Sequence, residues 1–267
     1  VNIRDVASYA QVSPITVSRV LNSPETVSPE TRAKVEAAIS ELGYIPNQIA
    51  RSLRSNRTNT LALVLTDITN PFWTTVARSV EDAASAQGFN VILCNTDENE
   101  KKQNEYLSVL LRKRVDGFLF VPARSEPDAV ERIQRQKVPV VVLDRSVPGA
   151  LVDVVRSDSE QGAYALTRHL LELGHRRIAL LSGPANVSTA QERLEGYKRG
   201  LAEAGLPVED CWILAGEYTV ASGYAATQKL LAGENLPTAL LGANNFIALG
   251  AMRAIREAGV LLPEDSS

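Results

Sequence analysis

The sequence contains few of the residues that build disulfide frameworks and metal sites. Among its 267 residues are two cysteines and two histidines. Cys94 and Cys211 lie far apart, each in an apolar setting, so we expect buried free thiols and no disulfide. His169 and His175 have no second histidine or carboxylate at ligand spacing, so a metal site is not expected either.

Long apolar runs are also lacking. None approaches the ~18 residues from which a transmembrane helix is built. The N-terminus shows no basic segment followed by a purely apolar one, as a signal peptide would. The hydrophobic share of 45% and the charged share of 22% are ordinary for a globular protein. These observations predict a cytoplasmic protein with no membrane partner, and the length predicts two or three domains.

Sequence motifs of common enzyme classes are absent as well. No Gly-x-Gly-x-x-Gly, Walker A or Gly-x-Ser-x-Gly motif follows a predicted strand. Nucleotide-dependent and hydrolytic functions are therefore without support. Because no catalytic constellation stands out, we expect neither an enzyme nor a bound cofactor.

Two apolar stripes near the N-terminus predict two short helices. The stripes consist of Val6, Ala7 and Ala10, and of Val17, Val20 and Leu21. Ser13 is a good N-cap for the second helix, and Pro14 suits its first position. Two helices that meet at a tight turn form a helix-turn-helix.

The outer side of the second helix would lie beside the bases if that helix entered a major groove. Thr16 and Ser18 carry hydroxyls that suit phosphate oxygens, and Arg19 can reach a guanine edge in bidentate fashion. Pro14 and Ile15 could discriminate only by apolar contact, for example with a thymine methyl. Taken alone, two short amphipathic helices also fit small domains that do not bind DNA.

A third helix is expected to begin after Ser28, a good N-cap followed by Pro29, and to end at Gly43. Its apolar residues follow the spacing i, i+3, i+4 and i+7. Together with the first two helices they predict a small core of Val6, Val17, Val20, Val35, Ala38, Ile39 and Leu42.

Charge separates the front of the chain from the rest. Residues 1–60 hold seven basic and five acidic side chains, or +2, whereas the remainder holds 21 basic and 26 acidic ones, or −5. Residues 42–66 include no acidic side chain. Residues 46–57 carry three arginines and too little apolar surface for an isolated helix, so they are predicted to be a linker that folds on a polyanion. This pattern is typical of a modular DNA-binding protein.

The rest of the chain alternates apolar runs with helical patterns. Buried parallel strands are expected at Leu61–Leu65, Val91–Cys94, Gly117–Val121, Val138–Leu143, Ile178–Leu181 and Ala239–Leu241. Helices are expected near 72–86, 99–113, 127–136, 159–173, 189–204, 221–232 and 246–258. This alternation predicts a doubly wound α/β fold, in which ligands bind at the carboxyl ends of the strands.

Side chains at the predicted strand ends are candidates for ligand binding. Phe72 and Trp73 follow the first strand and offer faces to a sugar ring or base, or else pack under the next helix. Asp144 and Arg145 end the fourth strand and could instead form a structural salt bridge. Asn245 is expected to cap the last helix.

Several motifs together resemble the lactose-repressor (LacI/GalR) family of bacterial transcription regulators. They are Asp5-Val6-Ala7, Val12-Ser13, Thr16-Val17-Ser18-Arg19-Val20-Leu21-Asn22, Val27-Ser28-Pro29-Glu30-Thr31, Leu42-Gly43-Tyr44-x-Pro46-Asn47 and Ala50-Arg51-Ser52-Leu53. The resemblance covers the entire chain. It implies a helix-turn-helix domain, a hinge helix and a periplasmic-binding-protein-like core of two doubly wound parallel-sheet subdomains with a cleft between them.

The resemblance also implies two sites. DNA would be contacted by Asn2, Arg4, Ser13, Pro14, Ile15, Thr16, Ser18, Arg19, Asn22, Thr26, Ser28, Thr31, Asn47, Ala50, Arg51, Leu53 and Arg54. A small-molecule effector would be bound by Asn70, Phe72, Trp73, Asp144, Arg145, Arg193 and Asn244. Within these sets, Leu53 would wedge into the minor groove from a hinge helix at Pro46 to Arg54, and Arg193 matches the family's effector-binding arginine.

We therefore hypothesise a dimeric or tetrameric repressor that binds a pseudo-palindromic operator and responds to a sugar or sugar phosphate. A purine effector remains an alternative, as does a solute-binding module without a DNA role. The expected division is a DNA-binding domain at 1–45, a hinge at 46–57 and core subdomains at 58–158 and 159–267.

Three features depart from the family pattern. Gln11 replaces the usual small turn residue, at a cost of about 1 kcal/mol if its φ is positive. Asn245 stands where the family usually has aspartate, which removes a charged acceptor from the cleft. The family continues for roughly a quarter of its length past a segment like Leu262-Pro263-Glu264-Asp265, so we expect the core to be C-terminally incomplete.

Overall fold

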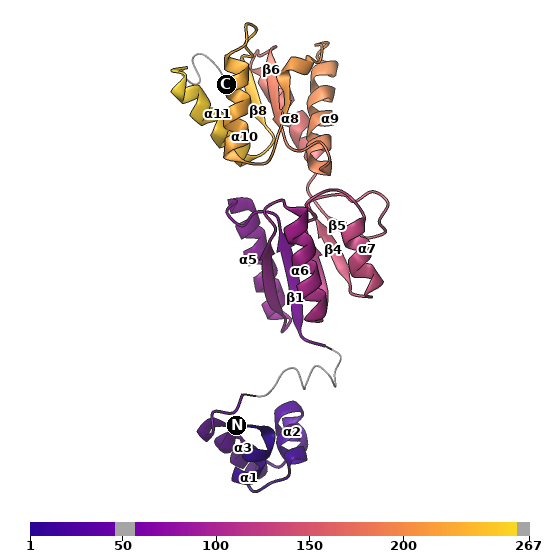
Figure 1. The fold of residues 1–267 in the computed structure, drawn as a ribbon, viewed down its shortest axis with the longest axis vertical. Coiled ribbons are helices and arrows are strands. Elements are labelled where there is room, and N and C mark those ends of the chain that lie inside the picture. The colour runs from indigo at the N-terminus through magenta and orange to yellow at the C-terminus, as the bar shows by residue number, and fades with distance from the viewer. Residues whose placement is uncertain (46–56, 261–267) are drawn as a thin grey trace. The chain divides into compact units, whose positions relative to one another are not determined.

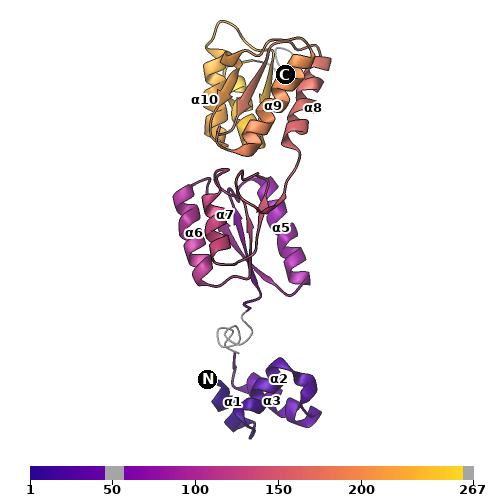
Figure 2. The same ribbon diagram turned by 90° about the vertical axis from the view of Figure 1, so that its right-hand side faces the viewer.

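The computed structural model describes residues 1–45 and 57–260. The chain divides into two compact units, Val1–Thr58 and Asn59–Ser267, drawn in Figures 1 and 2. The first unit is helical and the second combines parallel sheets with helices. The expected fold class, an N-terminal helix-turn-helix region followed by an α/β core, is therefore confirmed. Within the described ranges, no helix has both the length and the apolar character needed to span a bilayer.

Residues 1–45 of the first unit contain three α-helices and one 3-10 turn: α1 (Ile3–Tyr9), α2 (Pro14–Asn22), η1 (Pro24–Thr26) and α3 (Pro29–Glu41). The predicted start signals act as expected. Ser13 caps α2 and Ser28 caps α3; each hydroxyl oxygen accepts a hydrogen bond from the backbone N–H three residues on. A proline occupies the first turn of both helices, where its missing N–H costs no hydrogen bond.

A single small core holds the three helices together. Its buried members are Val6, Ala7, Ala10, Val17, Val20, Val35 and Ala38, with Ile39 and Leu42 partly buried against them. The whole predicted core is therefore confirmed. Because helices of this length are marginal alone, this shared burial fixes α2 and leaves its opposite face to solvent.

The turn between α1 and α2 holds one strained residue. Gln11 has a φ of 54°, in the left-handed region that costs a non-glycine residue about 1 kcal/mol or more. The φ of Gln11 is therefore positive, which is the case in which replacing the family's usual small turn residue was expected to strain the helix-turn-helix.

The second unit contains two parallel sheets. The first sheet has the strand order β2-β1-β3-β4-β5. Its strands are β1 (Thr60–Leu65), β2 (Asn90–Asn95), β3 (Gly117–Phe120), β4 (Val140–Leu143) and β5 (Asp153–Val155). Helix α5 (Pro71–Ala86) covers one face, and α6 (Glu100–Arg112) and α7 (Asp128–Arg135) cover the other (Figure 1).

The second sheet has the order β7-β6-β8. Its strands are β6 (Ile178–Ser182), β7 (Ile213–Ala215) and β8 (Ala239–Gly242), with a 3-10 turn η2 (Asp210–Trp212) before β7. Helices α8 (Ser159–Glu172) and α9 (Ser188–Glu203) cover one face, and α10 (Val220–Leu231) and α11 (Asn245–Glu257) cover the other. In both sheets the order reverses beside the first strand of that sheet along the chain, which opens a crevice at the carboxyl ends of the strands.

The predicted helices of this unit agree with the observed ones to within one residue at each end. The strand prediction missed β5 and β7. Both are three residues long and pair with one neighbour only, so neither needs the continuous apolar run by which a central strand is predicted. The fourth strand starts at Val140 rather than Val138, after Pro139, which has no N–H to donate.

Two glycines in the helices of the second unit should respond oppositely to alanine. A Cβ on Gly223 in α10 would overlap the backbone of Ile247, 2.7 Å from its Cα, whereas a Cβ on Gly162 in α8 would meet nothing within 4 Å. We expect Gly223→Ala to lower the free energy of unfolding by about 1–3 kcal/mol and Gly162→Ala to raise it by about 0.5–1 kcal/mol. Urea unfolding of the two variants checks this. An unchanged midpoint for Gly223→Ala would contradict the close approach of α10 and α11.

Candidate DNA interface and ligand cleft

One side of α2 faces solvent with side chains suited to DNA. Val17 and Val20 are buried in the core, whereas Ile15 is 66% exposed and Arg19 is exposed as well. Thr16 and Ser18 are half-buried between these extremes. The residues predicted to face DNA therefore share the side of α2 that does not contact the core.

Several predicted DNA-binding side chains also stabilise the local fold. The Ser13 hydroxyl accepts from the N–H of Thr16 at 3.1 Å and lies 2.9 Å from the Thr16 hydroxyl. Asn22 donates from Nδ2 to the carbonyl oxygen of Ser18 at 2.8 Å. Asn2 caps α1 in a reciprocal bond with the first turn. These bonds orient short polar groups along the edge of the unit.

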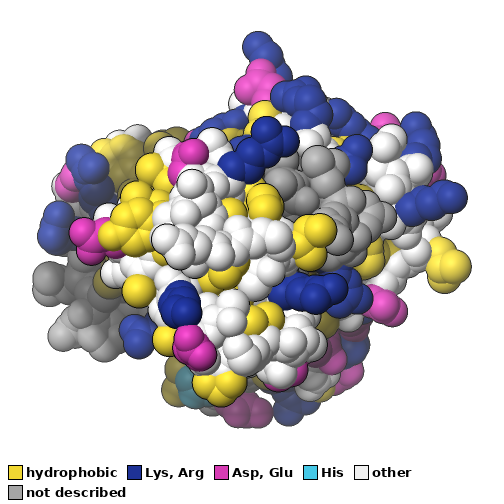
Figure 3. Space-filling model, turned by 90° about the horizontal axis from the view of Figure 1, so that it is seen from below, with side chains coloured by type: hydrophobic (Ala, Val, Ile, Leu, Met, Phe, Trp, Pro, Cys, Tyr) yellow, Lys and Arg dark blue, Asp and Glu magenta, His cyan; other side chains and the backbone are white. Residues whose placement is uncertain are grey.

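The basic residues of the first unit fall into two groups. Arg32 and Lys34 on α3 pair with glutamates one helical turn away, at 2.6 and 2.8 Å. Within residues 1–45, Arg4 and Arg19 form no ion pair. On the face seen in Figure 3, the basic side chains are scattered among polar and apolar ones. Residues 1–45 therefore present two cations, Arg4 and Arg19, that form no ion pair with another described residue.

The remaining predicted DNA contacts are Asn47, Ala50, Arg51, Leu53 and Arg54. These residues, and the hinge helix predicted at Pro46 to Arg54, lie outside the described residues.

The second unit contains a cleft of about 780 Å³, within the usual range for small-molecule sites. Loops that follow strands of both sheets line it, as the strand order predicts. From the five-stranded sheet come the segment after β1 and Asp144 after β4; from the three-stranded sheet come Tyr218 after β7 and Asn244 after β8. Arg193 reaches the cleft from α9. The structure thus brings the predicted effector-binding residues Asn70, Phe72, Trp73, Asp144, Arg145, Arg193 and Asn244 to one cavity.

Arg145 is the most deeply buried charge of the cleft, at 2% exposure. Its Nη1 and Nη2 atoms donate to the two carboxylate oxygens of Glu98 at 2.8 and 2.6 Å. Nη1 also donates to the carbonyl oxygens of Pro122 and Ala123. Because these donors are occupied, Arg145 mainly holds Glu98 and the loop after β3 in place. The partner of Arg145 is therefore Glu98 and not its neighbour Asp144.

Asp144 lines the cavity from the segment after β4, and Arg193 lines it from α9. Burial raises the pKa of the Asp144 carboxyl, while the nearby charges of Arg145 and Arg193 oppose that rise. Asp144 also has a φ of 66°, which turns the chain sharply after β4. Burial likewise raises the pKa of Tyr218, whose hydroxyl lies 3.2 Å from that of Thr189. A carboxylate and a guanidinium without ion-pair partners are suited to a ligand that both donates and accepts hydrogen bonds.

The two aromatic candidates differ in exposure. Trp73 is 7% exposed and packs with Leu63 and Leu65, whereas Phe72 is 53% exposed. Their rings meet edge to face with centroids 4.8 Å apart. Phe72 therefore offers the open face for stacking, and Trp73 supports it from the core.

Three of the asparagines that line the cleft are Asn70, Asn244 and Asn245. Asn70 and Asn245 exchange two side-chain hydrogen bonds, of 2.9 and 3.1 Å. The cap of α11 is Asn244, whose side chain accepts from the N–H of Ile247 at 2.8 Å, so the predicted cap at Asn245 is wrong. Because Asn245 instead bonds Asn70 on α5, the residue that replaces the usual aspartate joins the two halves of the core.

Several cleft residues were not predicted. Asp67, Thr189, Glu217 and Tyr218 line the cavity together with the expected residues. Glu217 and Tyr218 follow β7, which the apolar pattern did not predict. Candidates were taken from the ends of predicted strands, so these two residues were not among them. Asp67 lies two residues after the end of β1, in the segment from which Asn70, Phe72 and Trp73 were chosen, and was not itself assigned to the site.

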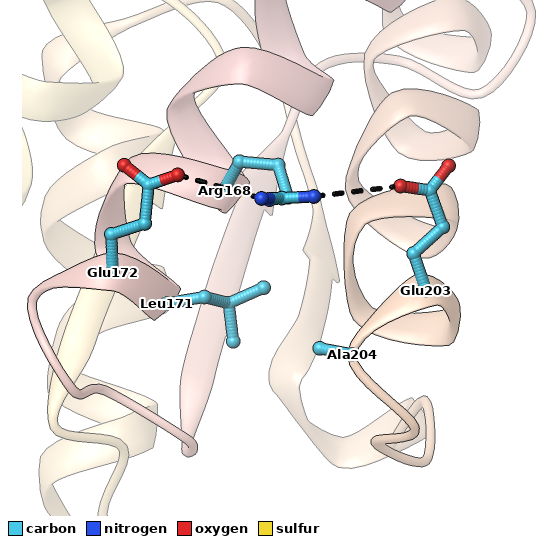
Figure 4. A pocket seen from close by; sticks show the side chains of 5 residues that line it. All are labelled: Arg168, Leu171, Glu172, Glu203 and Ala204. Carbon is cyan, nitrogen blue, oxygen red and sulfur yellow. Dashed lines mark ion pairs between the residues drawn. The ribbon is translucent and has the colours of Figure 1, made fainter.

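A smaller pocket of about 260 Å³ lies between α8 and α9 (Figure 4). Arg168 stands in it between Glu172 and Glu203, at 3.5 and 3.7 Å. Because two carboxylates already neutralise this cation, the pocket does not present a free charge to a ligand.

The cysteines show one expected and one unexpected environment. Cys94 is buried, and burial raises the pKa of its thiol. Cys211 is exposed, so the prediction of two buried thiols is wrong for this residue. It lies in the 3-10 turn η2, where neighbouring apolar residues do not imply burial. In the described ranges, no three histidine, cysteine or acidic side chains are grouped as metal ligands would be.

A helix-turn-helix unit joined to a two-sheet core with a ligand-sized cleft defines a class, the ligand-responsive transcription regulators. Residues 2–47 match the family of bacterial regulatory proteins of the lacI type. Residues 58–266 match the periplasmic binding proteins and sugar binding domain of the LacI family. The chain belongs to the LacI family of bacterial transcription regulators.

Individual relatives agree with this assignment. The HTH-type transcriptional repressor PurR of Photobacterium profundum is 38% identical over 99% of this chain and 80% of its own length. The Lac repressor dimer bound to operator and the anti-inducer ONPF is 31% identical, with a TM-score of 0.87 over 100% of this chain and 81% of that one. A LacI family regulator from Enterococcus faecium with bound ribose is 36% identical, with a TM-score of 0.68 over 78% and 75% of the two chains. These relatives are regulators, which supports the expectation that this chain is not an enzyme.

Proposed function

We propose that this protein is an effector-responsive repressor. Its first unit binds one half-site of a pseudo-palindromic operator in the cytoplasm, and two or four copies act together. A small molecule, a sugar first and a purine second, binds in the cleft and changes operator affinity. One observation carries this proposal: the same chain has an exposed α2 face with Arg19 and a cleft with Arg193, and neither arginine forms an ion pair with a described residue.

In this proposal the DNA-binding side chains divide by role. Arg19 reads a base edge, whereas Thr16 and Ser18 position α2 on phosphates. Pro14 and Ile15 add apolar contact with a thymine methyl. Residues 46–57 serve as the hinge between the DNA-binding domain and two core subdomains at 58–158 and 159–267.

The cleft would act on DNA binding through linkage. An effector that prefers one arrangement of the core shifts the population towards it. A tenfold change in operator affinity requires a differential affinity worth about 1.4 kcal/mol between the two arrangements. The Asn70–Asn245 pair, which joins the two halves of the core, is one contact that such a shift would have to change.

The purine alternative has a specific basis. The exposed face of Phe72 and the guanidinium of Arg193 could hold a flat heterocycle as well as a sugar ring. PurR repressors are among the relatives of this chain.

Selection of bound duplexes from a random DNA library by the full chain tests the proposal. We expect the selected sequences to share a pseudo-palindrome, and one compound among sugars and purines to change affinity for it at least roughly tenfold. Binding without sequence preference would reject the regulator. An operator affinity that no compound changes would reject the effector-responsive part.

A further inference from the structure

Acidic side chains outnumber basic ones in the lining of the cleft. Acidic side chains are Asp67, Asp97, Glu98, Asp144 and Glu217, and basic ones are Arg124, Arg145 and Arg193. The formal balance of the lining is therefore −2. Because a cleft with low-dielectric walls concentrates the field of its charges, this excess acts on any ligand that enters.

Ion pairs formed by the lining residues do not remove the excess of negative charge. Arg145 is bonded to Glu98, and Arg124 lies 3.6 Å from Glu100. Asp97 is paired with Lys102 at 2.5 Å. Among the described residues that line the cleft, Arg193 is thus the one cation without an ion pair.

Three carboxylates line the same cleft as this guanidinium and form no ion pair with another described residue: Asp67, Asp144 and Glu217. Asp67 accepts only from the N–H and hydroxyl of Thr69, at 2.8 and 2.7 Å. Asp144 interacts with Arg193 through space, without a contact short enough to be a salt bridge. All three carboxylates are acceptors, so they are suited to a ligand that donates several hydrogen bonds.

Helix N-termini could in principle attract an anion into the cleft. Those of α5, α6, α10 and α11 all reach it. Each, however, is capped by its own side chain: Asn70, Asn99, Thr219 and Asn244 accept hydrogen bonds from the first-turn N–H groups. Each of these caps occupies one of the free N–H groups at its helix start, and α5 begins with a proline that has none, so fewer donors remain for a phosphate.

We propose that the effector of this cleft carries no negative charge. The geometry is suited to a neutral, hydroxyl-rich molecule that donates to Asp67, Asp144 and Glu217 and accepts from Arg193. A phosphate ester adds about 1.5 to 2 negative charges at neutral pH and would meet three carboxylates for one free guanidinium. This inference rests on the proposed function, and it narrows the ligand class from sugars and sugar phosphates to the unphosphorylated form.

Titration calorimetry of the full chain with matched pairs tests the charge preference. Suitable pairs are ribose with ribose 5-phosphate, glucose with glucose 6-phosphate, and adenosine with its monophosphate. We expect the neutral member of the binding pair to bind at least roughly tenfold more tightly. A phosphate ester that binds as tightly as its parent would overturn the inference and leave the proposed function intact. Binding by neither member of any pair would overturn both.

A variant that removes one negative charge from the cleft tests whether the preference for neutral ligands arises there. Glu217 is exposed, so Glu217→Gln should fold normally and narrow the discrimination against phosphate by roughly threefold or more. Glu234→Gln is the matched control, because Glu234 is also exposed and does not line the cleft. If both variants change the discrimination equally, the preference results from the net charge of the chain, and the carboxylates of the cleft are not its cause.

Discussion

Arg19→Ala is expected to weaken binding to the selected operator by about 1–3 kcal/mol and to weaken binding to random DNA much less. Arg19 is exposed on α2, and within residues 1–45 it has no acidic partner that would compete for its guanidinium. A bidentate contact with guanine would be lost only where that guanine is present. Fluorescence anisotropy with operator and scrambled duplexes measures both losses.

Arg32→Ala is the matched control for this experiment. It removes the same charge from the same unit, but Arg32 is engaged with Glu36 on α3. We expect a small loss of equal size on both duplexes, as for a general electrostatic effect. Equal losses on operator and random DNA for Arg19→Ala would reject its role as a base-reading residue.

Arg193→Ala is expected to lower effector affinity by roughly tenfold or more, because a hydrogen bond to a charged group contributes about 1.5–3 kcal/mol. Among the described residues of the cleft, Arg193 is the cation without an ion pair, and its charge acts on Asp144. Its removal leaves the carboxylates Asp67, Asp144 and Glu217 in the cleft without the charged donor that lies among the lining residues. Calorimetric titration of the effector against the variant measures the loss, and operator affinity without effector should stay unchanged.

Lys198→Ala provides the control on the same helix. Lys198 lies one turn or more beyond Arg193 in α9, pairs with Glu195 and does not line the cleft. Its removal should leave effector affinity unchanged. If Arg193→Ala stays within about twofold of the unmodified chain, a difference of about 0.4 kcal/mol, the assignment of the effector site fails at its most specific residue.

Residues close together in the chain are enough to predict most of the local structure of both units. Ser13-Pro14 and Ser28-Pro29 are start signals that act within one helical turn, so α2 and α3 begin where they predict. The central strands β1, β3 and β6 are buried on both faces, and their continuous apolar runs predict them. The alternation of strands and helices also predicts ligand binding at the carboxyl ends of the strands, and the segments that follow β1, β4, β7 and β8 line the cleft.

Tertiary structure alone decided which side chains are free to act. Arg145 is bonded to Glu98, which lies 47 residues earlier in the chain. Asn245 is bonded to Asn70 at a separation of 175 residues. Trp73 turns into the core while Phe72 stays exposed, although both follow the same strand end. No local pattern encodes such choices, since a hydrogen bond or burial depends on where the rest of the chain folds. The edge strand β7 shows the same limit: it is defined by pairing with β6, and this pairing carries Glu217 and Tyr218 to the cleft.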